Sequence, residues 1–271
     1  MIKYYKDGHF RDSYLPDIED YESKQAEKFY NLKQPLQENR FSMLADLFTL
    51  QMEVLDIGCA TAGFLNILKG HVKKVRGIEL YKPHVEFAKN NLDLNVELKD
   101  IDEIKDERFD TICMFHVLEH IPEPISFIKK TYEMLNDGGM LILEVPNIND
   151  PLISVFDVAP YKNFYFMKPH LFYYGEASIE YLLNKIGFGS MEFRSFQHYG
   201  LMNHFCWSLT GETCTATKTG GGTMDFPGKY MDSPNIGLVI EFFEQMNEKY
   251  KEMVKKIGKT DTLLVIARKE K

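Results

Sequence analysis

The first candidate for a ligand-binding site in this sequence is a run of small residues. It lies between an apolar segment and a helical segment. Met52–Ile57 is apolar and leads into Gly58, Cys59, Ala60 and Gly63, after which a helical pattern begins. Gly58 allows a tight turn and a close approach to a ligand, and the following helix offers free N–H groups. This order of strand, turn and helix predicts a ligand cradle.

Two carboxylates beside this turn indicate which class of ligand it can bind. Asp56 ends the first predicted strand, and Glu79 ends the second, 21 residues after Gly58. A dinucleotide fingerprint requires G-x-G-x-x-G, whereas Ala60 stands at the second glycine. Asp56 repels a pyrophosphate and suits an ammonium group, while an acid at Glu79 commonly binds ribose hydroxyls. S-adenosylmethionine, a phosphate-free nucleoside with an amino acid end, fits these features.

The segments that must position these residues alternate between strand and helix. Such alternation predicts a parallel sheet with helices on both faces, whose strands end at one common edge. The predicted strands are Met52–Ile57, Lys73–Leu80, Asn95–Leu98, Phe109–Phe115 and Met140–Val145. The predicted helices are 24–48, Ala62–Leu68, Pro83–Leu92 and Pro122–Asn136, the last ended by Asp137-Gly138-Gly139.

The alternation stops after Pro146. Residues 147–174 contain no predicted element, but 151–174 carry eight aromatic residues, a density that predicts burial against the domain or over a ligand. The remaining predicted elements are a helix Gly175–Ile186, a strand Phe188–Gln197, a loop Thr210–Gly228, a helix Ile236–Ile257 and a strand Asp261–Arg268.

Three segments resemble motifs of the class I S-adenosylmethionine-dependent methyltransferases. Val54–Leu65 resembles their first motif, and Phe109–Ile112 with His116–Pro122 resembles their fourth-strand motif. Leu135–Asn147 is similar to the stretch through their fifth strand. The subgroup that looks closest is the small-molecule O-methyltransferases, which include ubiquinone-type and bacterial glycan-modifying enzymes. The sequence departs from the family at Ala60 and Ala62, where glycine is usual.

The resemblance implies an α/β fold: a Rossmann-like, doubly wound, seven-stranded mixed sheet with helices on both faces and aromatic-rich lid insertions. The last strand, Asp261–Arg268, suits the antiparallel place in such a sheet. We expect residues 1–45 to form an N-terminal helical cap and residues 46–271 to form the methyltransferase domain. Insertions at 147–174 and 198–235 are expected to bind the acceptor.

The resemblance also implies a cofactor shell at the strand ends. Asp56 and Gly58 would hold the methionine end, and Glu79 would bind the ribose hydroxyls. The alternatives are a solvated carboxylate at Glu79, a turn aspartate at Asp100 and a plain core residue at Phe115. The other implied cofactor contacts are Cys59, Ala60, Gly63, Leu80, Asp100, Ile101, Phe115 and His116.

Methyl transfer to a hydroxyl benefits from alignment and from a general base. His120 is the preferred base because an imidazole titrates near neutral pH, and His116 and His170 are the other catalytic candidates. The alternative is that Glu119 and His120 are a capping and packing pair of the loop. A Glu/His pair could also bind a divalent metal, but the sequence offers no third ligand at helical spacing. Polar and aromatic residues also gather after the sixth predicted strand, and they suit either a polyhydroxylated acceptor or a loop whose polar groups hydrogen-bond to one another. These residues are His198, Tyr199, Asn203 and His204.

Composition argues against several other classes. The chain has 32 basic and 40 acidic residues and a net charge of -8, so a phosphate backbone is an unfavourable partner. No apolar run approaches the ~20 residues of a membrane span, and no signal-peptide h-region is seen, so we expect a cytoplasmic protein. The four cysteines lack C-x-x-C spacing and are expected to be free thiols.

The sequence therefore predicts an enzyme that moves a methyl group from S-adenosylmethionine to a hydroxyl of a small molecule, such as a sugar or glycan precursor. Methylation of nitrogen or carbon, on an amino sugar or a quinone-like ring, stays open. A non-catalytic cofactor-binding protein is a further alternative. The expected partner is the small-molecule acceptor, with no nucleic acid and no membrane, and a homodimer stays open.

Overall fold

The computed structural model describes residues 23–212 and 235–270, and the predicted loop Thr210–Gly228 falls almost wholly outside these ranges. The described chain divides into two compact units. The first unit comprises the described residues up to Glu144, Glu180–Glu192 and the residues from Val265 on. The second unit comprises Val145–Ile179 and the described part of Phe193–Leu264.

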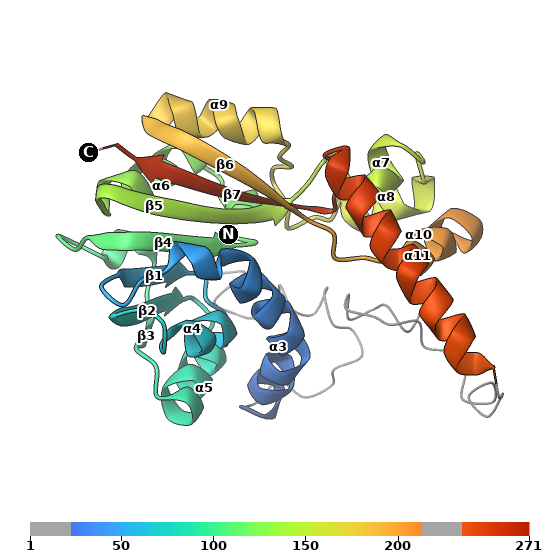
Figure 1. The fold of residues 1–271 in the computed structure, drawn as a ribbon. Helices are drawn as coiled ribbons and strands as arrows, with labels where there is room; N and C mark the ends of the chain where they lie inside the picture. Colours follow the sequence, from blue (N-terminus) through green and yellow to red (C-terminus); the bar gives the residue numbers. More distant parts are fainter. Residues whose placement is uncertain (1–22, 213–234, 271) are drawn as a thin grey trace. The chain divides into compact units, whose positions relative to one another are not determined.

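Seven strands form one mixed sheet in the order β3-β2-β1-β4-β5-β7-β6 (Figure 1). The strands β1 to β5 are parallel, with Val54 opposite Val75 and Thr111 opposite Met140, and β7 is antiparallel. The predicted Rossmann-like fold with an antiparallel last strand is confirmed. The strands are β1 Glu53–Ile57, β2 Lys74–Glu79, β3 Val96–Leu98, β4 Phe109–Phe115, β5 Leu135–Pro146, β6 Phe188–Phe196 and β7 Thr262–Lys269.

Helices flank the sheet, and α3 packs against α4 and α5. None of the helices in the described ranges is long and apolar enough to cross a membrane. The α-helices are α3 Ser23–Leu44, α4 Gly63–Leu68, α5 Lys82–Leu92, α6 Pro124–Glu133, α7 Pro151–Ser154, α8 Ala159–Tyr165, α9 Glu176–Ile186, α10 Leu201–Thr210 and α11 Ile236–Lys256. The short 3-10 helices are η1 Ala45–Leu47, η2 Ile101–Glu103 and η3 Leu118–His120.

A buried cluster fixes the turn after β1 on the neighbouring elements. Cys59 of the turn packs with Leu65 of α4, Val85 and Ala88 of α5, and Val96 of β3, and all five residues are at most 9% exposed. Apolar side chains at these positions of α4 and α5 face the sheet because they recur at helical spacing. The loop that carries the candidate cradle is therefore held by a core and not only by its own hydrogen bonds.

The second unit has an aromatic core of its own. Tyr161 and Tyr165 of α8 pack with Leu152 of α7 and Trp207 of α10, and these four residues are at most 7% exposed. Asp150 accepts a hydrogen bond from Tyr161 Oη at 2.9 Å and caps α7 through the N–H of Leu152 at 2.7 Å. Part of the aromatic-rich segment 151–174 is thus core of its own unit, which accounts for some of its aromatic density.

Two sequence-based assignments of elements were wrong. Asp137-Gly138-Gly139 does not end a helix, because α6 already ends at Glu133 and β5 begins at Leu135. Gly138 has a φ of 77°, and the pairing of β4 with β5 shifts register between Phe109 and Thr111, so the glycines serve an irregular strand. Residues 147–174 and 201–210 also contain helices (α7, α8 and α10) that were not predicted. Buried polar residues within α10, Asn203 and His204, break the apolar pattern that would have marked it.

The expectation of free thiols holds for only part of the cysteines. Cys59 and Cys113 are free and buried. Cys206 of α10 is disulfide-bonded, so the expectation was wrong there, and Cys214 lies outside the described residues.

Gly77 in the middle of β2 provides a test of this core. A Cβ built there would lie 2.6 Å from Cys59 Sγ and 2.9 Å from Leu65 Cδ1. We predict that Gly77→Ala lowers the free energy of unfolding by about 1–3 kcal/mol, because the close-packed core must shift. Gly70→Ala is the control, since nothing lies within 4 Å of its Cβ position. Urea unfolding followed by circular dichroism measures both variants, and equal stabilities would contradict the packing described here.

Candidate active site

The turn between β1 and α4 follows a glycine-like path although alanines stand in it. Ala60 and Ala62 have φ angles of 49° and 58°, and Gly58 has a φ of 71°. This left-handed region is natural for glycine and costs an alanine about 1–2 kcal/mol. The N–H groups of Gly58 and Cys59 donate to Ile78 O at 2.9 and 3.2 Å. The turn therefore keeps its contacts to β2 despite the departure from the family pattern.

Glu79, at the end of β2, lies directly beside this turn. Its Oε2 accepts a hydrogen bond from Ala60 N at 2.9 Å. Its Oε1 accepts from the N–H groups of Leu80 and Tyr81 at 2.7 and 2.9 Å. The carboxylate that was predicted to bind the ribose is thus held at the cradle by three backbone N–H groups.

Asp56, at the end of β1, is a buried carboxylate with an unsatisfied oxygen. The residue is 2% exposed, and its Oδ1 has no hydrogen-bond partner among the described residues. Burial raises the pKa of Asp56 to about 8, opposed by the charge of Arg40 and assisted by Glu79 and Glu144. An unpartnered buried acceptor is costly, and an ammonium group would satisfy it. The residues present therefore fit the amino acid end of S-adenosylmethionine.

Asp100 and Ile101 follow β3, as predicted, and begin η2. Asp100 Oδ1 accepts from Asp102 N at 3.2 Å, and Glu103 Oε2 accepts from Asp100 N at 2.8 Å, so the two acids form a capping box. Ile101 is 4% exposed. The proposed contact of Asp100 with the adenine amino group would add to this local role.

The helix α3 covers the beginning of α4. A Cβ built on Gly63 would lie 3.1 Å from Gln37 Cγ and 3.7 Å from Tyr30 Cε2. Tyr30 Oη accepts a hydrogen bond from Asn66 Nδ2 at 2.9 Å. Gly63 therefore allows a close approach of α3, which brings polar side chains of this helix to the cradle.

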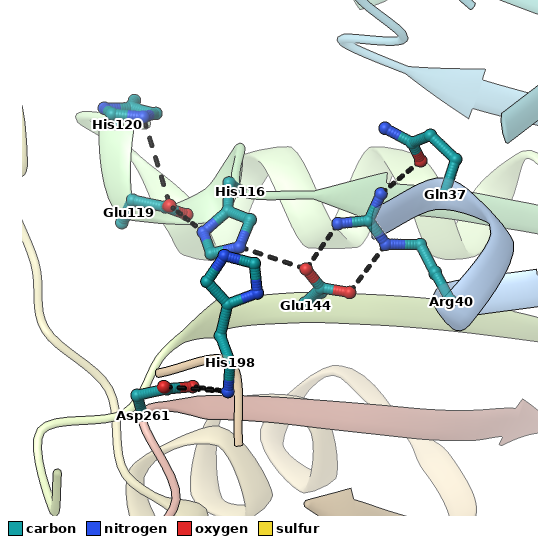
Figure 2. Close-up of polar contacts among 8 residues, drawn as sticks. All are labelled: Gln37, Arg40, His116, Glu119, His120, Glu144, His198 and Asp261. Carbon is teal, nitrogen blue, oxygen red and sulfur yellow. Dashed lines mark hydrogen bonds and ion pairs between the residues drawn. The ribbon is translucent and has the colours of Figure 1, made fainter. Parts of the chain in front are cut away.

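A buried network of charges occupies the ends of β4 and β5 (Figure 2). Arg40 of α3 donates from Nε to Glu144 Oε2 at 2.7 Å and from Nη2 to Glu144 Oε1. His116 Nε2 lies 3.0 Å from Glu144 Oε1, and His116 Nδ1 lies 3.3 Å from Glu119 Oε1. Arg40 also lies over the ring of Phe115, 4.2 Å from its centroid. The network joins α3 to two strand ends of the sheet.

Arg40 and Glu144 were not among the residues predicted for the site. They are 104 positions apart, so no local spacing connects them. A single arginine in a helix with a weak amphipathic pattern gives no signal by itself. Glu144 stands inside the segment that resembles the fifth-strand motif, which was the one clue available.

These contacts set the protonation of the network. Burial alone would lower the pKa of His116, but hydrogen bonds and charges from Glu119 and Glu144 outweigh it and raise the pKa to about 9. Burial would raise the pKa of Glu144, but Arg40 and His116 hold it well below its ordinary value. Because each ring nitrogen of His116 faces a carboxylate, the ring carries both protons. His116 is therefore a cation at neutral pH.

The three histidines named as catalytic candidates have different surroundings. His116 and His120 flank Glu119 on the segment from β4 to η3, with His120 Nε2 4.0 Å from Glu119 Oε1. His120 is 7% exposed, whereas the side chain of His116 is 41% exposed. His170 belongs to the second unit, where its ring lies 5.4 Å from that of Tyr173. His116 and His120 therefore lie on either side of one buried carboxylate.

The predicted polar cluster after β6 is built around Asp261 of the second unit. Asp261 Oδ2 accepts from the N–H groups of His198 and Tyr199, each at 2.8 Å, as Figure 2 shows for His198. Gln197 Nε2 donates to the same oxygen at 3.0 Å. His204 is bonded to Tyr250 Oη, and burial lowers the pKa of His204 to about 4. Much of this cluster therefore holds its own unit together.

Comparison with known proteins identifies the family. A family model described as a methyltransferase domain matches residues 27–190, which is more than half of the 271 residues. The chain therefore belongs to this methyltransferase family. Its cradle, its sheet order and this match together define a methyltransferase domain of the S-adenosylmethionine-dependent kind.

Curated relatives match over part of their length. A ubiquinone biosynthesis O-methyltransferase of Coxiella burnetii (strain RSA 493 / Nine Mile phase I) is 33% identical over 103 residues, covering 35% of this chain and 44% of the relative. A tRNA U34 carboxymethyltransferase of Nautilia profundicola is 33% identical over 100 residues, 34% of this chain and 33% of the relative. The chain thus spans less than half the length of these relatives.

Solved structures share the fold at low sequence identity. An S-adenosylmethionine-dependent methyltransferase of Archaeoglobus fulgidus has a TM-score of 0.57 at 19% identity, covering 87% of this chain and 94% of that one. A methyltransferase of Thermotoga maritima, described as a possible histamine N-methyltransferase, has a TM-score of 0.56 at 16% identity, covering 91% and 95%. These similarities confirm the fold alone.

The buried acid Asp56 predicts a pH dependence of stability. Its folded pKa of about 8 exceeds the ordinary 3.8, so the native state keeps a proton that the unfolded state loses. Its contribution to stability is present below about pH 4 and is lost as the pH rises to 8, by at most about 1.4 kcal/mol per pH unit. We predict that Asp56→Asn removes this slope between pH 4 and 8.

Urea unfolding at several pH values measures this effect. Asp93→Asn, a substitution of an exposed aspartate at the end of α5, is the matched control and should keep the slope of the original protein. Parallel stability profiles for Asp56→Asn and the original protein would show that Asp56 is not buried as an acid.

Proposed function

We propose that this protein transfers the methyl group of S-adenosylmethionine to a hydroxyl oxygen of a small molecule. The unsatisfied, buried Oδ1 of Asp56 beside the glycine-like turn carries the cofactor assignment. The cationic His116, whose side chain is 41% exposed between two buried carboxylates, carries the acceptor assignment. The O-methyltransferase relatives support the same acceptor atom.

The cofactor would be held by residues of the first unit. Asp56 would bind its ammonium group, Glu79 its ribose hydroxyls, and Arg40, a buried cation, its carboxylate. When bound, S-adenosylmethionine supplies an electrophilic methyl group on a sulfonium. The other residues proposed to contact the cofactor are Gly58, Cys59, Ala60, Gly63, Leu80, Asp100, Ile101, Phe115 and His116.

The histidines would play separate roles at the acceptor. His116 is protonated at neutral pH, and its two ring N–H groups face Glu119 and Glu144, so we assign it to stabilise the acceptor oxygen through its charge as that oxygen gains negative charge. His120, whose ring lies beside the same carboxylate, Glu119, is the preferred candidate for the base, with His170 second. Glu119 and Glu144 keep His116 cationic and oriented.

The acceptor class follows from this charge. A phenolic or sugar hydroxyl becomes more acidic beside the cationic His116. A small-molecule hydroxyl is thus favoured over nitrogen, and the net charge of -8 disfavours a nucleic acid. Methylation of an amino sugar or a quinone-like ring carbon is the competing assignment.

Binding of the cofactor is the first test. We predict that Glu79→Ala weakens the binding of S-adenosylhomocysteine about 100-fold, because two hydrogen bonds from the ribose to a charged group are lost. Glu86→Ala, which removes an exposed carboxylate of α5 paired with Lys82 at 3.4 Å, is the control. Isothermal titration calorimetry measures both. An unchanged affinity in Glu79→Ala, or no binding to the original protein, would contradict the proposed site.

The acceptor assignment is tested by chemistry and by pH. Incubation with S-adenosylmethionine and either catechol or ethanolamine, followed by measurement of S-adenosylhomocysteine, should give turnover with the phenol and not the amine. With the accepted hydroxyl compound, kcat/KM should fall as the pH passes about 9, where His116 loses its proton beside Glu119, Glu144 and Arg40. Preference for ethanolamine would overturn the proposal of oxygen as the acceptor atom.

Variants separate the two histidines. His116→Gln should abolish the fall above pH 9, because an amide carries no charge and does not titrate. His120→Asn should lower kcat about 10²–10⁴-fold with little effect on S-adenosylhomocysteine binding, as expected for loss of a base. Full activity of His120→Asn would contradict His120 as the base. It would indicate that His170 is the base or that the reaction needs none.

A further inference from the structure

The helix α11 is anchored to α10 along one face. Asn247 Oδ1 accepts a hydrogen bond from Leu201 N at 2.9 Å. Tyr250 Oη is bonded to His204, and Val254 is 1% exposed. These three positions of α11 are spaced by three and four residues, so they lie on one face of the helix. This face fixes α11 within the second unit.

A second, apolar face of α11 is exposed. Leu238 is 69% exposed and Phe242 58%, and towards the other end Met253 is 44% and Ile257 50% exposed. The half-buried Met246 lies between the two pairs. The four exposed residues are spaced as a stripe, and the 19 residue steps from the first to the last correspond to about 28 Å along a helix. Exposed apolar side chains gathered on one helix face, here in two pairs with the exposed Lys249 between them, are typical of an interaction site.

The charges of α11 are divided between its two halves. The first half is acidic and the second is mainly basic, with Glu248 and Glu252 as the exceptions. The acidic residues of the first half are Glu241 and Glu244, and the basic residues of the second half are Lys249, Lys251, Lys255 and Lys256. A helix with this pattern is complementary to a copy of itself that runs in the opposite direction. A parallel copy would place acid against acid and base against base.

We propose that two copies of this chain dimerise through antiparallel α11 helices related by a two-fold axis. The stripe is nearly symmetric about its centre, between Asn247 and Glu248. An axis at that point places Leu238 against Ile257 of the second copy and Phe242 against Met253 of the second copy. Each apolar pair occurs twice, as required in an isologous interface.

The same axis determines which charges meet. Glu241 and Lys256 are both exposed, and they border the apolar stripe on the same side of α11. In the antiparallel pair Glu241 of one copy lies beside Lys256 of the other, and the contact is repeated by symmetry. This gives a test that does not depend on removing apolar residues.

Sedimentation velocity of the full-length chain over a range of concentrations tests the proposal. The original protein should be a dimer. Glu241→Lys and Lys256→Glu should each raise the dimer dissociation constant about tenfold, because two like-charge contacts replace two attractive ones. The double variant restores both contacts with reversed polarity and should return the constant to within about threefold of the original. Phe242→Glu should give a monomer.

Tyr181→Glu is the matched control, because Tyr181 of α9 is 68% exposed and lies off the stripe. It should leave the dimer intact. Circular dichroism of each variant checks folding, and the charge variants alter exposed residues only. A monomeric original protein at 100 μM, or a double variant as weak as either single variant, would overturn the proposal. Neither result bears on cofactor binding, which the calorimetry above tests separately.

Discussion

Burial of negative charge is the constraint on which the candidate site depends. Asp56, Glu119 and Glu144 stand at strand ends or just beyond them, and each is at most 2% exposed. Removing a carboxylate from water costs several kcal/mol unless a cation or hydrogen-bond donors replace the water. Arg40 and His116 offset this cost for Glu119 and Glu144. The helix α3 is therefore part of the site and not only a cover over it.

This distribution of charge divides the site into two ends. At the end of β5 and in η3, the acids remain ionised because they share His116 and Arg40, and that end is electrostatically balanced. At the end of β1, Asp56 retains an unsatisfied oxygen and a pKa raised to about 8 by burial. A cationic ligand lowers the free energy of the second end more than that of the first. The position proposed for the ammonium group of the cofactor follows from this difference.

The sequence predicted those site residues whose positions depend on interactions between neighbouring segments of the chain. Asp56, Gly58 and Glu79 could be placed because a strand end, a tight turn and a ribose-binding acid follow each other at a fixed spacing, and parallel strands end at one edge. The ion pair between Arg40 and Glu144 could not be predicted, because the two residues are 104 positions apart and meet only when α3 packs near the end of β5. The helix α10 was missed for a related reason, since Asn203 and His204 are polar residues whose burial only the assembled unit explains.

The alanines of the turn bear on whether the site is functional. Glycine is kept where space is short: a Cβ on Gly58 would lie 2.7 Å from Val117, and one on Gly63 would lie 3.1 Å from Gln37. Alanine stands at Ala60 and Ala62, where the left-handed backbone costs only about 1–2 kcal/mol each and the hydrogen bond from Ala60 N to Glu79 remains. Internal packing therefore requires glycine at Gly58 and Gly63. The alanines leave the backbone path of the turn and its hydrogen bond to Glu79 in place, so the departure from the family pattern does not disrupt the cradle.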